Sequence, residues 1–179
     1  MQKRSIGLTF AIIAVVIGAV LFCVGCMADA AVNNAAETPK PAATPAKNLT
    51  TADVAKLKWI EGMWRGLDGD KPFYERYRLE NASILIVETL TDGDPNRVKD
   101  VSRFELKDGV FGKTEGERGS AATFISGDAV QFVAVPPGKG NAFRFERKSD
   151  DKWNAVLEWN DKDGKPQQKV YQMEKWPAR

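Results

Sequence analysis

The sequence contains no histidine, and its only two cysteines, Cys23 and Cys26, lie near the N-terminus. Histidine is the commonest general base, the usual zinc ligand and the usual proximal ligand of haem. Its absence excludes serine–histidine–aspartate and cysteine–histidine catalysis. Because no cysteine follows Cys26, the rest of the chain has neither a disulfide bond nor a thiol nucleophile. We therefore expect no metal site, no cofactor and no enzymatic activity.

A strong charge of one sign is also missing. The 26 lysines and arginines nearly balance the 24 aspartates and glutamates, which gives a formal net charge of +2. Two of the positive residues, Lys3 and Arg4, precede the first apolar run, so the remainder of the chain is close to neutral. Acidic and basic residues are interspersed there without a basic stripe, and no nucleic-acid partner is expected.

The longest apolar run lies near the N-terminus, where Ile6 to Gly25 follow the positive stretch Met1 to Arg4. This order is typical of a segment that directs export from the cytoplasm. Three fates remain open for the segment. Ala28 and Ala30 suit cleavage by a signal peptidase, with a mature chain starting at Ala31. Alternatively, about 20 apolar residues suffice for an uncleaved membrane anchor.

The third fate is attachment of a lipid to Cys26. Val24-Gly25-Cys26 matches the end of a lipoprotein signal, although Cys23 stands where leucine is usual. Residues Met27 to Lys47 are rich in alanine and proline, which is typical of a disordered tether and favours the lipoprotein. We therefore predict a signal or anchor segment (1–26), a tether (27–49) and a folded domain (50–179), exported to the cell envelope, in the periplasm or on the outer surface.

The folded domain is predicted to begin with one short helix and to continue as strands. Thr50 and Asp53 form a capping pair for a helix that runs to about Trp59, and Gly62 ends it. From there the apolar period is two, with Asp-Gly and Gly-Asp turns between the runs, which predicts antiparallel hairpins. The predicted strands are Met63–Leu67, Phe73–Leu79, Ser83–Leu90, Val98–Lys107, Val110–Lys113, Ala121–Ser126, Ala129–Val135, Phe143–Lys148, Trp153–Trp159 and Lys169–Lys175. An open sheet of so many strands would leave long edges, so we predict an all-β, closed up-and-down β-barrel of about eight to ten strands.

The alternation of side chains places two charges on otherwise apolar faces. Glu75 shares a face with Phe73 and Tyr77, and Arg147 shares one with Phe145. An unpaired charge inside a barrel costs several kcal/mol, so each needs a partner, water or a ligand. A register shifted by one residue would instead place both outside. Further candidates for inward-facing residues are Val130, Phe132, Ala134, Trp153, Ala155, Leu157 and Trp159, with Ser102, Ser126 and Gln172 as additional polar ones.

A short motif resembles a known family of barrels. Gly62-Met63-Trp64 follows the predicted helix and opens the first strand, as the Gly-x-Trp signature does in the calycins, the lipocalin and fatty-acid-binding-protein group. The longer string from Leu57 to Gly66 resembles a bacterial family of secreted lipocalin-like domains of unknown function. The resemblance implies that the Trp64 indole closes one end of the barrel beneath a basic side chain, with Lys175 the better match and Lys169 the weaker.

Three functional hypotheses follow from these features. The first is a membrane-tethered barrel that binds a small hydrophobic or amphipathic ligand in its interior. Its candidate ligand-binding residues are Glu75, Tyr77, Phe132, Phe145, Arg147 and Trp159. The second is a non-catalytic domain with a filled core that contacts other envelope proteins. The third, an enzyme that uses carboxylates such as Glu75 with Tyr77, has the least support because no recognisable catalytic constellation is present.

Overall fold

The computed structural model describes residues 44–115, 118–138 and 140–177. The predicted export segment, with Cys26, lies outside these residues. A short α-helix and a 3-10 helix precede the strands, and no helix in the described ranges is long and apolar enough to cross a membrane. The elements are α1 (Thr51–Ala55), η1 (Lys56–Ile60), β1 (Gly62–Asp68), β2 (Lys71–Asn81), β3 (Ile84–Leu90), β4 (Val98–Lys107), β5 (Val110–Glu115), β6 (Arg118–Ile125), β7 (Ala129–Val135), β8 (Ala142–Arg147), β9 (Lys152–Asn160) and β10 (Pro166–Lys175).

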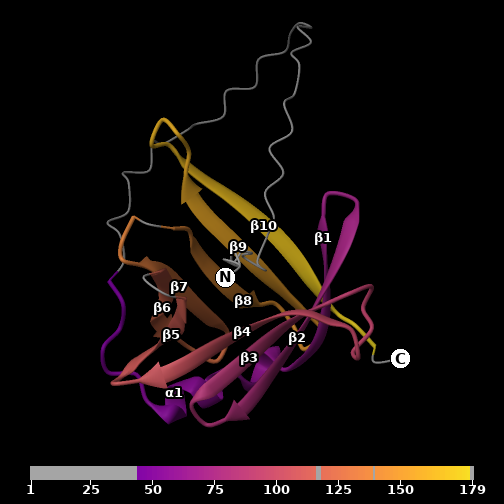
Figure 1. The fold of residues 1–179 in the computed structure, drawn as a ribbon, viewed down its shortest axis with the longest axis horizontal. Helices are drawn as coiled ribbons and strands as arrows, with labels where there is room; N and C mark the ends of the chain where they lie inside the picture. The colour runs from indigo at the N-terminus through magenta and orange to yellow at the C-terminus, as the bar shows by residue number, and fades with distance from the viewer. Residues whose placement is uncertain (1–43, 116–117, 139, 178–179) are drawn as a thin grey trace, which may run out of the picture. The chain divides into compact units, whose positions relative to one another are not determined.

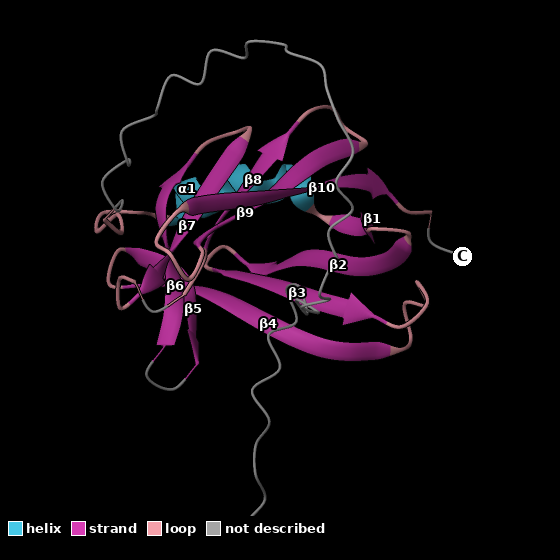
Figure 2. Ribbon diagram, turned by 90° about the horizontal axis from the view of Figure 1, so that it is seen from above, coloured by secondary structure: helices cyan, strands magenta, loops and turns pink. Residues whose placement is uncertain are grey.

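The strands form a closed antiparallel barrel. Each strand pairs with the next one along the chain, and β1 pairs with β10 to complete the circle (Figures 1 and 2). The predicted all-β up-and-down barrel is therefore confirmed, and the ten strands of the described residues coincide with the ten predicted runs to within a few residues. A ten-stranded barrel has a wider interior than the eight-stranded barrels that side chains just fill.

The helical segment lies at one end of the barrel (Figure 1). The Asp53 carboxylate accepts hydrogen bonds from the Thr50 amide at 2.9 Å and from the Thr50 hydroxyl at 2.8 Å, so the predicted capping pair is present. The α-helix ends at Ala55, earlier than predicted, and a 3-10 turn continues to Ile60. This tighter turn buries Leu57 and Ile60 completely against the barrel end.

The segment before the helix differs from the prediction. It was expected to belong to a disordered tether up to residue 49, but its last part lies against the barrel. The Ala46 amide donates to the Ala122 carbonyl at 2.9 Å, and the Leu49 amide donates to the Gly109 carbonyl at 2.9 Å. A β-bulge in β6, next to Ala122, and the turn at Gly109 leave these carbonyls free of the strand ladders. Alanine- and proline-rich composition does not reveal such main-chain acceptors.

Candidate binding site inside the barrel

The register of β2 decides which side chains face inward. Glu75 pairs with Trp64 of β1 and Thr89 of β3, and Tyr77 pairs with Val87. Burial alternates along the strand in the same phase, since Glu75 and Tyr77 are buried whereas Arg78 is exposed. The two side chains therefore occupy the inner face, as the alternation predicted.

Glu75 is the central polar group of this inner face. Its residue is 5% exposed, and the Tyr77 hydroxyl donates a hydrogen bond of 2.6 Å to its Oε2. No lysine or arginine nitrogen of the described residues pairs with it. Burial raises the pKa of the Glu75 carboxyl from 4.5 to about 7, and the hydrogen bond from Tyr77 only partly offsets this. Burial, together with the neighbouring carboxylate, also raises the pKa of the Tyr77 hydroxyl well above 10.

Aromatic rings lie on both sides of Glu75. Tyr77 packs edge-on against Trp153, with ring centroids 5.6 Å apart. Phe73, two residues before Glu75 on the same face, packs edge-on against Tyr171 of β10 at 5.6 Å. Tyr171 is 2% exposed, and burial raises the pKa of its hydroxyl, an effect that the nearby Lys169 ammonium partly offsets.

The inner face is sealed at the helical end. The Trp64 indole donates to the Ile60 carbonyl at 2.6 Å, and its ring packs edge-on against Trp153 at 5.9 Å. Lys175 Nζ lies 4.4 Å from the centroid of Trp64 and donates to the Glu61 carbonyl at 2.6 Å. The structure thus places the three signature residues together, because Gly62 has a positive φ of 118° and leaves room for the Lys175 side chain.

Away from this end the inner face is accessible to solvent. Several residues that the ladders place inside are only part-buried, which would not occur in a core packed throughout. They come from walls on opposite sides of the barrel: Phe73, Thr89, Asp100, Lys113, Ser120, Phe143, Ala155 and Trp159.

The predicted site residues divide between these two parts. Phe132 and Phe145 are buried in the aromatic cluster that continues from the sealed end, with Phe132 stacked on Phe143 at 4.7 Å. Trp159 faces inward near the β9–β10 turn. Of these predicted residues, Tyr77 reaches the Glu75 carboxylate with a hydrogen bond.

Arg147 does not join Glu75. By register it belongs to the inner face beside Trp153. However, it is the last residue of β8, so its guanidinium reaches out of the barrel to a close ion pair with Asp150 and lies 3.9 Å from Asp128. The alternation predicted the correct face for Arg147. It did not show that Arg147 ends its strand, and this position determines that Arg147 pairs with Asp150.

Sequence reasoning missed Tyr171 and Lys113 as inward-facing residues, and it named Lys169 only as the weaker partner of Trp64. Lys113 Nζ donates to the Ser102 hydroxyl at 2.7 Å. Lys169 forms a close ion pair with Asp68 and lies 4.8 Å from the centroid of Tyr171. The alternation of Lys169, Tyr171 and Met173 could have predicted this inward face, but the charge of Lys169 made the pattern look polar at its start. Of the other polar candidates, Ser102 is buried inside, whereas Gln172 is exposed on the outer face and Ser126 belongs to a turn.

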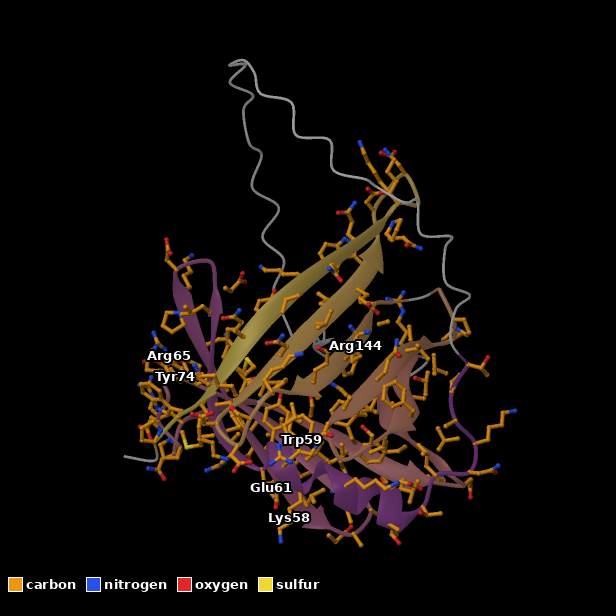
Figure 3. All side chains as sticks on the ribbon, turned by 180° about the vertical axis from the view of Figure 1, so that it is seen from behind. Lys58, Trp59, Glu61, Arg65, Tyr74 and Arg144 are labelled. Carbon is orange, nitrogen blue, oxygen red and sulfur yellow. The ribbon has the colours of Figure 1, made fainter. Side chains whose placement is uncertain are left out.

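The outer face carries other features. Arg65 and Tyr74, neighbours across β1 and β2, both contact the Trp176 ring (Figure 3). A shallow hollow of about 270 Å³ lies between the helical segment and the β2–β3 turn, near Lys58 and Glu61. Among the described residues, no group of three or more acidic or cysteine side chains is arranged to hold a metal ion.

Comparison with known proteins gives a distant structural likeness. No protein-family model matches the chain, and no curated protein matches it. The crystal structure of a protein of unknown function from the DUF3598 family of Nostoc punctiforme superposes with a TM-score of 0.46 at 17% sequence identity. The match covers 79% of this chain and 53% of that protein, so this chain spans about half its length. The comparison assigns no function to the chain.

Proposed function

We propose that this protein is an exported barrel, tethered to the membrane by its N-terminal segment, that binds a small amphipathic molecule in its interior. The observation that carries the proposal is Glu75, a buried carboxylate with one hydrogen-bond donor, on an inner face that is open to solvent beyond it. An apolar residue of similar volume would make the empty barrel more stable. A group that lowers stability at an interior position is typical of a functional site.

The interior has the two parts that an amphipathic ligand requires. Phe73, Phe143, Leu157 and Trp159 supply apolar surface on the inner face. Glu75 and the Tyr77 hydroxyl supply polar contacts, and ligand pockets usually combine many apolar contacts with a few polar ones.

The test uses N-phenyl-1-naphthylamine, a neutral amphipathic probe whose fluorescence rises in apolar surroundings. Saturable binding at one site per chain is expected. Ala155 faces inward and is part-buried, so Ala155→Trp fills the interior and should abolish binding. The neighbouring Asn154 faces outward, and Asn154→Trp is the matched control that keeps binding. Circular dichroism verifies that both variants fold. Absence of probe binding, or equal binding by both variants, contradicts the proposal.

The tether is tested separately. Intact-mass measurement of the full chain expressed in a bacterial host should show a diacylated or triacylated N-terminal Cys26. A mature chain that starts at Ala31 would contradict tethering by a lipid, and an uncleaved N-terminus would replace the lipid with an apolar anchor. Neither result affects the binding proposal.

Contact with another envelope protein is the second candidate function. Val98 and Val101 on β4 are 41% and 54% exposed, and they supply apolar surface outside the barrel. This function gains support if Ala155→Trp clearly lowers stability and no probe binds to the wild type, since the interior is then a packed core without room for a ligand.

A further inference from the structure

The inner face holds cations, but each has an acceptor of its own. Arg147 pairs with Asp150, Lys169 pairs with Asp68, and Lys113 donates to the Ser102 hydroxyl. Glu75 differs, because within the described residues its carboxylate receives only the Tyr77 hydroxyl and no cation. Glu75 is therefore a buried negative charge without a cation partner among the described residues.

We infer that the polar group of the ligand is a protonated amine, which donates its N–H groups to the Glu75 carboxylate beside Tyr77. This inference rests on the proposed interior binding function and specifies its ligand class. A carboxylate ligand, as in fatty-acid carriers, would bring a second negative charge next to Glu75, where the Tyr77 hydroxyl is already donated to Glu75. Like charges at hydrogen-bond distance repel strongly in a buried site.

The surroundings of Glu75 suit an ammonium group. Phe73 and Tyr171 pack edge-on at 5.6 Å, and Tyr77 adds a third ring on the same inner face. Aromatic rings attract an ammonium through their negatively polarised faces. An amine thus satisfies the buried Glu75 carboxylate, which has no cation partner among the described residues.

The proton balance gives the inference a pH dependence. The pKa of Glu75 is raised to about 7 by burial, so below this pH the carboxyl is mostly neutral and attracts an ammonium weakly. Binding of a protonated amine requires the ionised form. Its affinity should therefore rise about tenfold per pH unit from pH 5 towards pH 7 and level off above, as long as the amine keeps its proton.

The experiment compares three ligands of equal chain length, each below its micelle concentration, by displacement of N-phenyl-1-naphthylamine at pH 8. We expect dodecylamine to bind at least tenfold more tightly than dodecanol, and dodecanoate to bind more weakly than dodecanol. Glu75→Gln should remove the advantage of the amine and its pH dependence, while the affinity for dodecanol changes less than twofold. Glu88→Gln, on the outer face of β3, is the control and should preserve the order.

The outcomes separate the two proposals. If the probe binds but dodecanoate competes as well as dodecylamine, or the amine keeps its advantage in Glu75→Gln, the ligand class is wrong and interior binding stands. The same holds if the probe binds and none of the three ligands displaces it. If the probe does not bind at all, interior binding itself fails. Thermal denaturation of Glu75→Gln verifies that a lost preference does not reflect unfolding.

Discussion

The inner and outer faces of β2 and β3 each bury one glutamate, and the two are treated differently. Glu75, inside, is 5% exposed and receives one hydroxyl. Glu88, outside, is 8% exposed, lies 2.5 Å from Arg76 Nε and 3.9 Å from Arg78 Nε. The two glutamates are thus buried to a similar extent, but one is paired with cations and the other is not. The Glu88 carboxylate is paired with two arginines of the neighbouring strand, whereas the Glu75 carboxylate has no cation partner among the described residues.

The outer pairing extends across three strands. The further members on β2 and β4 are Glu80, Arg103 and Glu105, which link to Arg78 and to one another. Long arginine and glutamate side chains cover apolar outer residues such as Ile86 with their methylene groups, which explains why Ile86 is buried on a face exposed to solvent. The outer face thus carries a network of ion pairs, whereas the buried Glu75 carboxylate on the inner face has no cation partner among the described residues.

The largest effect is expected from removing the ring that seals the inner face. Trp64→Ala should lower the free energy of unfolding by about 3–5 kcal/mol, because the side chain is fully buried and its neighbours cannot close the cavity. Urea denaturation measures the change. Trp176→Ala is the control on the outer face, where the ring is only part-buried, and should lower the free energy clearly less. Equal losses of unfolding free energy in the two variants would show that Trp64 stabilises the barrel no more than Trp176 does.

The next effect concerns the pH dependence from Glu75. Its folded pKa of about 7 exceeds the ordinary 4.5, so the folded state holds the proton more tightly. Its contribution to stability is complete below pH 4.5 and is lost as pH rises towards 7, in total about 3 kcal/mol. The difference in unfolding free energy between wild type and Glu75→Gln, measured from pH 4 to pH 8, should therefore move in favour of the variant. A pH-independent difference would contradict the buried, unpaired state of Glu75.

A smaller effect is expected at the paired glutamate. Glu88→Gln should lower the free energy of unfolding by about 1–2 kcal/mol, since Arg76 and Arg78 lose the charge between them. Glu105→Gln is the matched control, because this carboxylate is half exposed and 3.8 Å from Arg103, and its loss should change stability by less than about 0.5 kcal/mol. The unfolding free energies of both variants are measured by equilibrium denaturation in low and high salt. An equal change in both would show that burial does not strengthen the ion pair of Glu88.

The smallest effect is expected at the cation over Trp64. Lys175→Met keeps most of the side-chain length and removes the charge, and should lower the free energy of unfolding by about 0.5–1 kcal/mol. Lys152→Met removes a lysine near the same end whose Nζ lies 3.4 Å from an exposed Glu174 carboxylate, and should have almost no effect. If thermal denaturation shows no difference between the two variants, the contact with the indole does not stabilise the barrel end.

The strands could be predicted because each is a local pattern. A period of two with turn residues between the runs is visible in a few neighbouring residues, as in Phe73 to Leu79. The helix was predicted less well beyond Ala55, because the switch to a 3-10 turn depends on how Leu57 and Ile60 meet the barrel. The contacts of residues 46–49 with Ala122 and Gly109 could not be predicted for the same reason, since one acceptor lies in β6 and the other in the turn between β4 and β5, both far along the chain.

By itself, the sequence determined the fold class and the inward side of strands with clear alternation, such as β2 with Glu75, because these follow from alternation and turn chemistry. Only the tertiary structure decided which inward charges meet. Arg147 and Glu75 are equivalent by pattern, yet the position of Arg147 at the end of β8 gives it Asp150, while Glu75 lies within its strand and keeps Tyr77 alone. Partners across a barrel depend on the stagger of the strands and on their closure, and neither is encoded in the period of a single strand.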